Sequence, residues 1–294
     1  MTLTTNADAA RRDAPGQVLQ ALRLPRKGTV YDLDPGRFAG MPLYQGHPPW
    51  QLISYRTPQG IRNQGDQKWL AEGNEVNVSI MTEILIAGMH SGAHIDALAH
   101  ITCGPDAHWH GGYSANEHLS DFGPMNNDAS TIQPIIARGV LIDLAAALGY
   151  DRLPASYAVS VEEFEAALRR QGTAVRDGDV VLFRTGQMSV WPDRDRWAET
   201  SGAGITLPVA ERLIESGVRA VGGDTETVEV MPSIVPGNPH PIHIRLLIEE
   251  GIHLIECLYL EDLARDGVYE FLFITLPAKI TGATASLVRP VAVI

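Results

Sequence analysis

The feature that most constrains this chain is a cluster of three histidines and one aspartate between His90 and His100. His90, His94 and Asp96 offer neutral nitrogen and anionic oxygen donors, the set that suits Zn²⁺ or Mn²⁺. Gly92 can bend the chain so that these donors converge, because glycine adopts backbone angles closed to other residues. If a helix begins near Asp96, His100 shares its face. Scattered surface histidines are the alternative, but four donors at this spacing predict a metal site with His100 beside it.

Residues 77–87 directly precede this cluster and alternate between two faces. β-Branched residues dominate one of these faces, which carries Val78, Ile80, Thr82, Ile84 and Ile86. A period of two with such residues is typical of a β-strand. We therefore expect the cluster to begin at the end of a rigid strand, which a metal site requires.

The string from His90 to His100 resembles the His-x-Gly-Thr-His-x-Asp-x-Pro-x-His signature of the putative cyclase family of metal-dependent hydrolases. Bacterial kynurenine formamidase and isatin hydrolase belong to that family. Ala93 stands where the family usually has Thr, and Leu98 where it often has Pro. Neither of these two positions supplies a metal ligand, so we still expect the metal to bind. The geometry around His94 is expected to differ from that of the family. The segment Asp96-Ala97-Leu98, which stands in place of Asp-x-Pro, looks more like the isatin hydrolase branch of the family than the formamidase branch.

The resemblance also implies a fold. The family has an α/β sandwich of the swivelling β/β/α type, with a mostly antiparallel, barrel-like sheet flanked by helices. The order of strand and helix signals is compatible with it, although that order alone would equally suggest a doubly wound sheet. A capping box at Ser160 and Glu163 predicts a helix over Val161–Gln171, which Gly172 ends. An apolar strand is expected over Val180–Phe183.

A second group of donors is expected near the C-terminus. In the strand predicted over Ile252–Leu260, Glu256 is the only polar residue on an aliphatic face. A buried carboxylate needs a cation, so Glu256 makes either an ordinary salt bridge or a contact with the metal. The family carries a similar His…Glu pair, which implies that His243 and Glu256 are further metal donors.

Two weaker candidates concern the substrate. Trp50 lies in a proline-rich segment similar to one that covers the family's active site, and it is either a substrate contact or a packed loop residue. Asp224 follows a strand and two glycines, so it is either a plain turn residue or, as in the family's Gly-x-Asp, a residue near the substrate. Four other histidines are expected to lie outside the site, the first two in solvent: His108, His110, His240 and His253.

The composition of the chain limits the classes of protein to which it can belong. The 294 residues, 45% hydrophobic and 20% charged, suffice for a globular core. A net charge of −12 argues against a nucleic-acid partner, which needs clustered Lys and Arg. Cys103 and Cys257 give no disulfide framework, and no apolar run reads as a signal peptide or membrane span, so we expect a cytoplasmic protein. Residues 1–16 read as a loose tail and residues 17–294 as one domain.

The donor set predicts hydrolysis. A metal held by His90, His94 and Asp96 lowers the pKa of water toward ~7 and polarises a carbonyl, while His100 can move protons. We expect a hydrolase, an amidohydrolase in the broad sense, acting with metal-activated water on an isatin-, formamide- or lactone-type small molecule. A metal-dependent lyase or cyclase acting on a small carbonyl compound and a non-catalytic metal- or ligand-binding protein are the alternatives. Family resemblance implies a homodimer or homotetramer.

Overall fold

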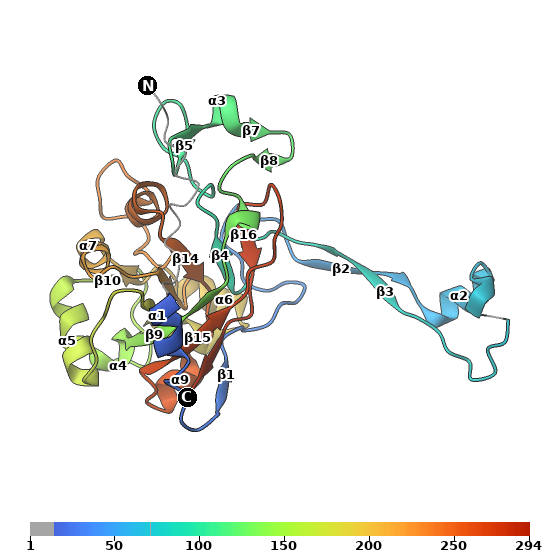
Figure 1. Ribbon diagram of the computed structural model, residues 1–294, viewed down its shortest axis with the longest axis horizontal. Helices are drawn as coiled ribbons and strands as arrows, with labels where there is room; N and C mark the ends of the chain where they lie inside the picture. The colour runs from blue at the N-terminus through green and yellow to red at the C-terminus, as the bar shows by residue number, and fades with distance from the viewer. Residues whose placement is uncertain (1–14, 71) are drawn as a thin grey trace.

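A nine-stranded sheet organises the body of the protein, seen in a computed structural model that describes residues 15–70 and 72–294 (Figure 1). Its strands, in spatial order, are β1 (Val30–Asp32), β17 (Val291–Val293), β15 (Glu270–Thr275), β9 (Ile135–Asp143), β11 (Val180–Arg184), β13 (Ala220–Gly223), β14 (His253–Glu256), β4 (His94–Asp96) and β16 (Ala285–Leu287). Of the expected tail, residues 1–14 lie outside the described residues, and Pro15 and Gly16 begin the first helix.

The sheet is mixed, so the expected mostly antiparallel arrangement is not confirmed. Strands β9, β11, β13 and β14 run parallel, and the strands on both sides of them pair antiparallel. The parallel strands follow from the helices between them, because a parallel pair needs a crossover connection. The crossover helices and the other helical segments of the body are α1 (Pro15–Ala21), α4 (Leu144–Ala147), α5 (Val161–Gln171), η3 (Gln187–Val190), α6 (Arg194–Thr200), α7 (Leu207–Glu215), α8 (Pro241–His243), the π-helical η4 (Ile244–Glu250) and α9 (Glu261–Arg265).

Local signals account well for the crossover helices. The helix expected over Val161–Gln171 is confirmed as α5, with the Ser160 and Glu163 capping box formed and Gly172 in a left-handed conformation at its end. The strand expected over Val180–Phe183 is confirmed as β11, one residue longer. None of the helices within the described ranges combines the length and apolar character needed to cross a membrane.

Each central strand divides its side chains between two hydrophobic cores. In β11, Val181 and Phe183 pack with the crossover helices, whereas Val180 and Leu182 enter the other core, as the period of two in a strand requires. That second core also holds Ile95 of β4 and Phe273 of β15, two strands far apart in the sheet order. The sheet therefore curls into a half-barrel around this core and is flanked by helices.

A long arm leaves the body between residues 51 and 86 (Figure 1). It consists of β2 (Gln51–Arg56), α2 (Pro58–Gln64), η1 (Lys68–Leu70) and β3 (Thr82–Ile86). The strand expected over residues 77–87 is thus shorter, and it pairs only with β2. Every β3 residue is exposed, so β3 is not the rigid support expected for the metal cluster. The sheet strand β4 supplies that support instead.

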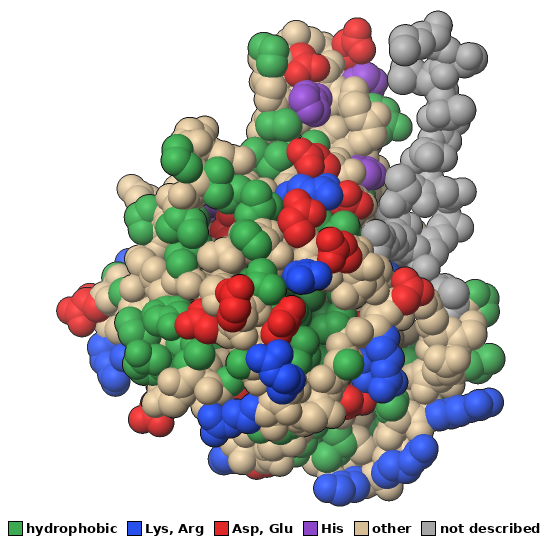
Figure 2. Space-filling model, turned by 90° about the vertical axis from the view of Figure 1, so that its left-hand side faces the viewer, with side chains coloured by type: hydrophobic (Ala, Val, Ile, Leu, Met, Phe, Trp, Pro, Cys, Tyr) green, Lys and Arg blue, Asp and Glu red, His purple; other side chains and the backbone are tan. Residues whose placement is uncertain are grey.

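Short elements cover the end of the body that carries β4. They are β5 (His108–Trp109), β6 (Tyr113–Ser114), α3 (Ala115–His118), β7 (Leu119–Ser120), β8 (Gly123–Pro124) and η2 (Ala129–Thr131), and a further parallel pair joins β10 (Ala158–Val159) to β12 (Gly204–Ile205). On the face turned away from the arm, acidic and basic side chains are interspersed (Figure 2).

Candidate metal centre

The cluster is built on β4, which lies between β14 and β16. Because side chains alternate along a strand, His94 and Asp96 share one face while Ile95 points into the core. His94 lies directly opposite Glu256 of β14 in the antiparallel register. Gly92 has a φ of 60° in the turn before β4, a left-handed conformation that turns the chain between His90 and the strand.

The donor atoms of His90, His94 and Asp96 converge. Oδ1 of Asp96 lies 3.1 Å from Nδ1 of His90 and 3.6 Å from Nε2 of His94. The three ligand atoms lie within 4.8 Å of one another. Asp96 is fully buried, yet neither of its carboxylate oxygens, nor Nε2 of His94, makes a hydrogen bond with the described residues. Since buried polar atoms are normally paired, this arrangement fits a bound cation.

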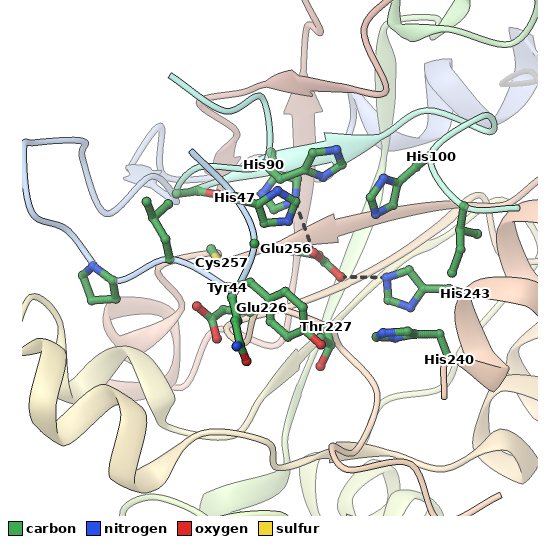
Figure 3. Close-up of a pocket in the computed structure, with 17 residues that line it drawn as sticks. Tyr44, His47, His90, His100, Glu226, Thr227, His240, His243, Glu256 and Cys257 are labelled. Atoms are coloured by element: carbon green, nitrogen blue, oxygen red, sulfur yellow. Dashed lines mark hydrogen bonds and ion pairs between the residues drawn. The ribbon is translucent and has the colours of Figure 1, made fainter. Parts of the chain in front are cut away.

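His243 and Glu256, the pair that the family resemblance implied as further donors, lie against the same cluster (Figure 3). Oε2 of Glu256 lies 3.2 Å from Nε2 of His94, and Oε1 lies 3.4 Å from Nε2 of His243. Nε2 of His243 is also 3.9 Å from Oδ2 of Asp96. Two buried carboxylates therefore share one cluster with three imidazoles, which gives enough nitrogen and oxygen donors for a divalent metal.

Electrostatics support the same interpretation. Burial raises the pKa of Asp96, and the nearby Glu256 carboxylate adds to this shift. Burial would also raise the pKa of Glu256, but interactions with His243 and His94 outweigh it and lower that pKa. Burial lowers the pKa of His90 to about 2, so this ring is a neutral nitrogen donor. A divalent cation would satisfy both the carboxylates and the neutral imidazole.

His100 lies beside the cluster, in a turn after β4 and not in the helix considered above. Its amide donates to the carbonyl of Ala97 at 3.0 Å. The His100 ring centroid lies 4.0 Å from that of His90 and 6.1 Å from that of His243. Burial lowers the pKa of His100 to about 4, so the ring is neutral near pH 7 and free to accept a proton.

Neighbouring groups fix the rings of the donors. Nδ1 of His94 donates to the carbonyl of Gly92 at 2.8 Å, which leaves Nε2 facing the cluster. Nδ1 of His243 donates to Oε1 of Glu229 at 2.5 Å. Burial alone would lower the pKa of His243, but its contacts with Glu229 and Glu256 raise it to about 10. Partners of this kind set the tautomer and orientation of a metal-binding imidazole.

Four members of the cluster line a cavity of about 340 Å³: His90, His94, His243 and Glu256. Its other walls come from residues 42–47, from Glu226 and Thr227, and from His240 and Cys257 (Figure 3). A cavity of this size suits a small molecule. Trp50 is not among these lining residues. It lines an adjoining hollow together with Tyr44 and His47, so the expected substrate contact of Trp50 is not seen.

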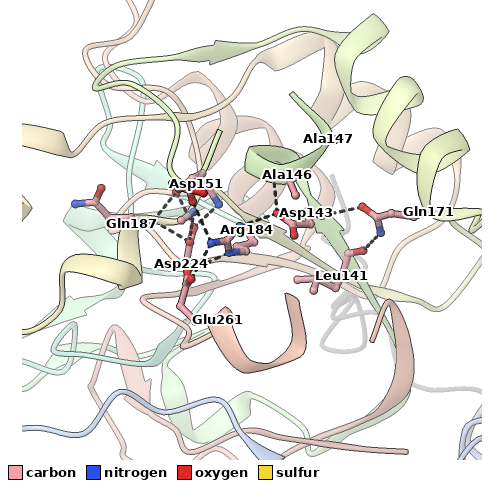
Figure 4. A network of polar contacts seen from close by, with 12 residues as sticks. Leu141, Asp143, Ala146, Ala147, Asp151, Gln171, Arg184, Gln187, Asp224 and Glu261 are labelled. Atoms are coloured by element: carbon pink, nitrogen blue, oxygen red, sulfur yellow. Dashed lines mark hydrogen bonds and ion pairs between the residues drawn. The ribbon is translucent and has the colours of Figure 1, made fainter. Parts of the chain in front are cut away.

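Asp224 also lies apart from the cavity. Its Oδ1 atom accepts hydrogen bonds from the amide and hydroxyl of Thr185, and its Oδ2 atom accepts from the amides of Gly186 and Gln187 (Figure 4). Asp224 is fully buried and both oxygens are occupied within the fold. Of the two alternatives for Asp224, these contacts favour the structural one, in which Asp224 holds the loop after β11 in place.

Two of the remaining histidines do not lie where we expected them. His240 lines the cavity, so its exclusion was wrong. His110 is buried and donates to a backbone carbonyl at 2.8 Å, which also corrects its expected place in solvent, whereas His108 is partly exposed. His253 lies outside the cavity, where its Nδ1 atom donates to the carbonyl of Asp96 at 2.7 Å and holds β4.

Several cavity residues were missed by the sequence analysis. The ring of His47 stacks on that of His90, with centroids 4.9 Å apart and planes at 15°. Tyr44 and Thr227 complete this side of the cavity. Glu226 is largely buried, its Oε1 atom makes no hydrogen bond with the described residues, and burial raises its pKa to about 7. An acidic residue just after a buried strand was the available signal for Glu226, whereas His47 carried none.

Comparisons with known proteins agree with this architecture. A family model described as "Putative cyclase" matches residues 32–230. A crystal structure of a novel cyclase superposes with a TM-score of 0.83 at 24% identity, covering 97% of this chain and 95% of the other. Isatin hydrolase A from Ralstonia solanacearum has a TM-score of 0.66 at 21% identity, covering 90% and 91%. A predicted metal-dependent hydrolase from Bacillus stearothermophilus has a TM-score of 0.55 at 18% identity, covering 91% and 98%. At these identities the likeness establishes the fold alone. No curated protein matches the sequence.

Proposed function

The chain belongs to the putative cyclase family, and from that premise we propose that it is a metal-dependent hydrolase. Its proposed substrates are small cyclic or N-acyl amides or lactones, of the isatin, formamide or lactone type. The structural neighbours include an isatin hydrolase and a predicted metal-dependent hydrolase, which supports this choice of chemistry.

One observation carries the proposal. The donor atoms of His90, His94 and Asp96 lie within 4.8 Å of one another, and both histidines line a cavity large enough for a small molecule. A purely structural metal site closes its ligand shell within the protein. Here the donors face a cavity that also contains titratable side chains, which favours catalysis over simple metal binding.

The roles of the chain's own residues follow from their positions. His90, His94 and Asp96 would hold the metal, with His243 and Glu256 as further donors. The metal, when bound, would polarise a carbonyl group and lower the pKa of water. His100, next to His90, would accept a proton from the attacking water and return it to the leaving nitrogen or oxygen.

Other parts of the proposal concern the surroundings of the enzyme. The free thiols of Cys103 and Cys257 are compatible with the proposed cytoplasmic location, where cysteines stay reduced. A lyase or cyclase reaction on a small carbonyl compound would use the same donors, and it is separated from hydrolysis by whether oxygen from water enters the product.

The test begins with metal-free protein, reloaded with Zn²⁺ or Mn²⁺ and measured for metal content by elemental analysis. We expect the loaded protein to release acid from at least one of N-formylkynurenine, isatin and simple lactones. In ¹⁸O-labelled water the product should gain one labelled oxygen. Unlabelled product would favour the lyase alternative.

Variants connect this activity to the site. His90→Ala, His94→Ala and Asp96→Ala should each lose the metal and the activity while retaining the circular dichroism spectrum of the folded chain. His108→Ala is the matched control, since His108 pairs with Asp106 outside the cavity and should keep both. Full metal content and rate in any of the three variants would refute the ligand assignment.

A further inference from the structure

A smaller pocket adjoins the cavity, and the reaction proposed above does not use it. This side pocket has a volume of about 50 Å³, and it shares Tyr44, Glu226 and Thr227 with the wall of the main cavity. The rest of its wall is formed by Gln187, Trp197, Ser201, Gly202, Thr225 and Met231. A hollow of roughly 10–15 Å³ already admits one water molecule. The side pocket therefore has room for one small substituent of a molecule that is bound in the main cavity.

Two buried polar atoms on the wall of the side pocket lack a partner. Oε1 of Glu226 and Nε1 of Trp197 are shielded from solvent, and neither makes a hydrogen bond with the described residues. Trp197 is only 4% exposed. Its indole N–H lies close enough to Glu226 to lower the pKa of the carboxyl, although the two groups are not in hydrogen-bond geometry. Since buried polar atoms are normally paired, a further polar group is needed to complete this pocket.

The side pocket holds an acidic group without a basic partner. Glu226 is the acidic side chain among the described residues that line it, and none of those residues is a lysine, an arginine or a histidine. Burial raises the pKa of Glu226 to about 7, because removal from water disfavours a carboxylate. A cationic group placed against Oε1 would offset that cost, whereas an anionic group would be repelled.

The loop that carries Glu226 is fixed on both sides of this residue. The carbonyl of Thr225 accepts a hydrogen bond from the amide of Cys257 at 2.9 Å. The hydroxyl of Thr225 accepts from the amide of Val228 at 3.1 Å. These contacts hold the backbone around Glu226, so the carboxyl is in place before a ligand arrives. A group that is already ordered loses little freedom on binding, which favours affinity.

The side pocket lies within reach of the proposed metal donors. The charges of Glu256 and His94 both shift the pKa of Glu226, and all three residues line the main cavity. Glu226 lies beside Tyr44, and His243 lies on the other side of Glu256 (Figure 3). One small molecule can therefore extend from the donor cluster into the side pocket.

On the basis of the hydrolase function proposed above, we propose that the substrate carries a cationic nitrogen, which Glu226 binds in the side pocket. The Glu226 carboxylate is the counter-ion, and Tyr44 and Trp197 supply aromatic walls. Aromatic side chains of this kind attract ammonium groups. An ionised carboxylate is also a stronger acceptor for the neighbouring Trp197 N–H. The substrate class then narrows to amides, formamides and lactones that bear an amino substituent.

The first experiment measures binding without turnover. Benzylammonium and the neutral benzyl alcohol, which have nearly the same shape, are titrated by calorimetry into protein loaded with Zn²⁺. We expect benzylammonium to bind at least 10-fold more tightly. Glu226→Gln keeps the volume and removes the charge, so it should raise the Kd of benzylammonium by roughly 10–100-fold and leave that of benzyl alcohol unchanged. The circular dichroism spectrum checks that the variant is folded.

Glu162→Gln is the matched control. Glu162 is an exposed residue in the first turn of α5, away from both pockets, and its replacement makes the same change in charge. The control should bind benzylammonium as wild type does. Equal binding of the two probes by wild type would overturn the proposal, and so would an unchanged Kd of benzylammonium in Glu226→Gln.

The second experiment measures turnover of meta-(aminomethyl)formanilide and of its neutral isostere meta-ethylformanilide. Wild type should favour the amino compound by at least 10-fold in kcat/KM, mainly through KM, and Glu226→Gln should abolish this preference. Binding through Glu226 with no hydrolysis of any substrate would contradict the hydrolase function and leave the cation site standing. Hydrolysis of both compounds without a preference would support the hydrolase function and overturn the role of Glu226.

Discussion

Replacing Asp96 by Asn should have opposite effects on stability with and without metal. In the metal-free protein the Asp96 side chain is fully buried, and its oxygens lie 3.1–3.9 Å from nitrogens of His90, His94 and His243 without forming hydrogen bonds. These histidines offset the cost of burial only in part, because the pKa of Asp96 is still raised. A buried carboxylate that is only partly compensated costs several kcal/mol, whereas a buried amide lacking partners costs about 1–3 kcal/mol. Asp96→Asn should therefore stabilise the metal-free protein by about 1–3 kcal/mol.

Bound metal should reverse the order of stability of wild type and Asp96→Asn. A ligand present at about 100 times its Kd stabilises the folded state by about 2.7 kcal/mol, and Asp96→Asn should lose most of that gain. Differential scanning calorimetry with EDTA, and then with Zn²⁺ or Mn²⁺, measures both effects. In a chain of this size 1 kcal/mol corresponds to a shift of about 2–4 °C in Tm. The variant should melt above wild type in EDTA and below it with metal.

Asp179→Asn provides the contrast. Asp179 is equally buried, but its two oxygens accept hydrogen bonds from Arg138 at 2.9 and 2.8 Å. Its loss leaves Arg138 partly unpaired, so we expect a loss of about 3–5 kcal/mol with or without metal. If Asp96→Asn instead lowers the Tm in EDTA and keeps the full response to metal, the inference that Asp96 is a metal donor whose charge the protein compensates only in part is wrong.

Three further outcomes follow from the same contacts. Glu256→Gln keeps the volume but removes the charge beside His94, and it should weaken metal affinity by about 10–100-fold in a competition titration; unchanged affinity would leave Glu256 as a salt-bridge partner. His100→Asn should keep the metal and lower kcat by about 10²–10⁴ with little change in KM, measured on the best substrate of the panel, whereas loss of metal would make it a ligand. Arg184→Met removes the partner of buried Asp143 and of Glu261 (Figure 4), at 2.9 and 2.7 Å, and should cost about 3–5 kcal/mol by calorimetry; a loss as small as that of exposed Arg265→Met would contradict this.

The parts that the sequence predicted well depend on neighbouring residues. Helix α5 begins and ends where its capping box and Gly172 require, because those signals act within one turn. His90, His94 and Asp96 lie together because a bend and a three-residue strand suffice. Glu256 was identified by its place on an apolar strand face, which is also a local pattern.

The parts that escaped prediction depend on contacts between distant segments. The parallel order of β9, β11, β13 and β14 is a property of the whole sheet. The family resemblance suggested a mostly antiparallel sheet instead. His47 reaches His90 only because the arm returns the chain to its starting point. The alternation in β3 resembled that of a half-buried strand, yet in the described chain both of its faces are exposed. A period of two reports that a strand has an apolar face, and it cannot report whether that face is buried.

The position of β4 also sets the order of events during synthesis. This strand is short, and both of its neighbours, β14 and β16, come much later in the sequence. On the ribosome the His90–Asp96 segment emerges long before either neighbour exists, so the nascent chain can offer a metal only a loose and unselective group of ligands. Glu256 and His243 join that group only when β14 and the helix before it have been made. The choice of metal is therefore left to a sheet in which β4 is already paired, where geometry rather than raw affinity discriminates among ions.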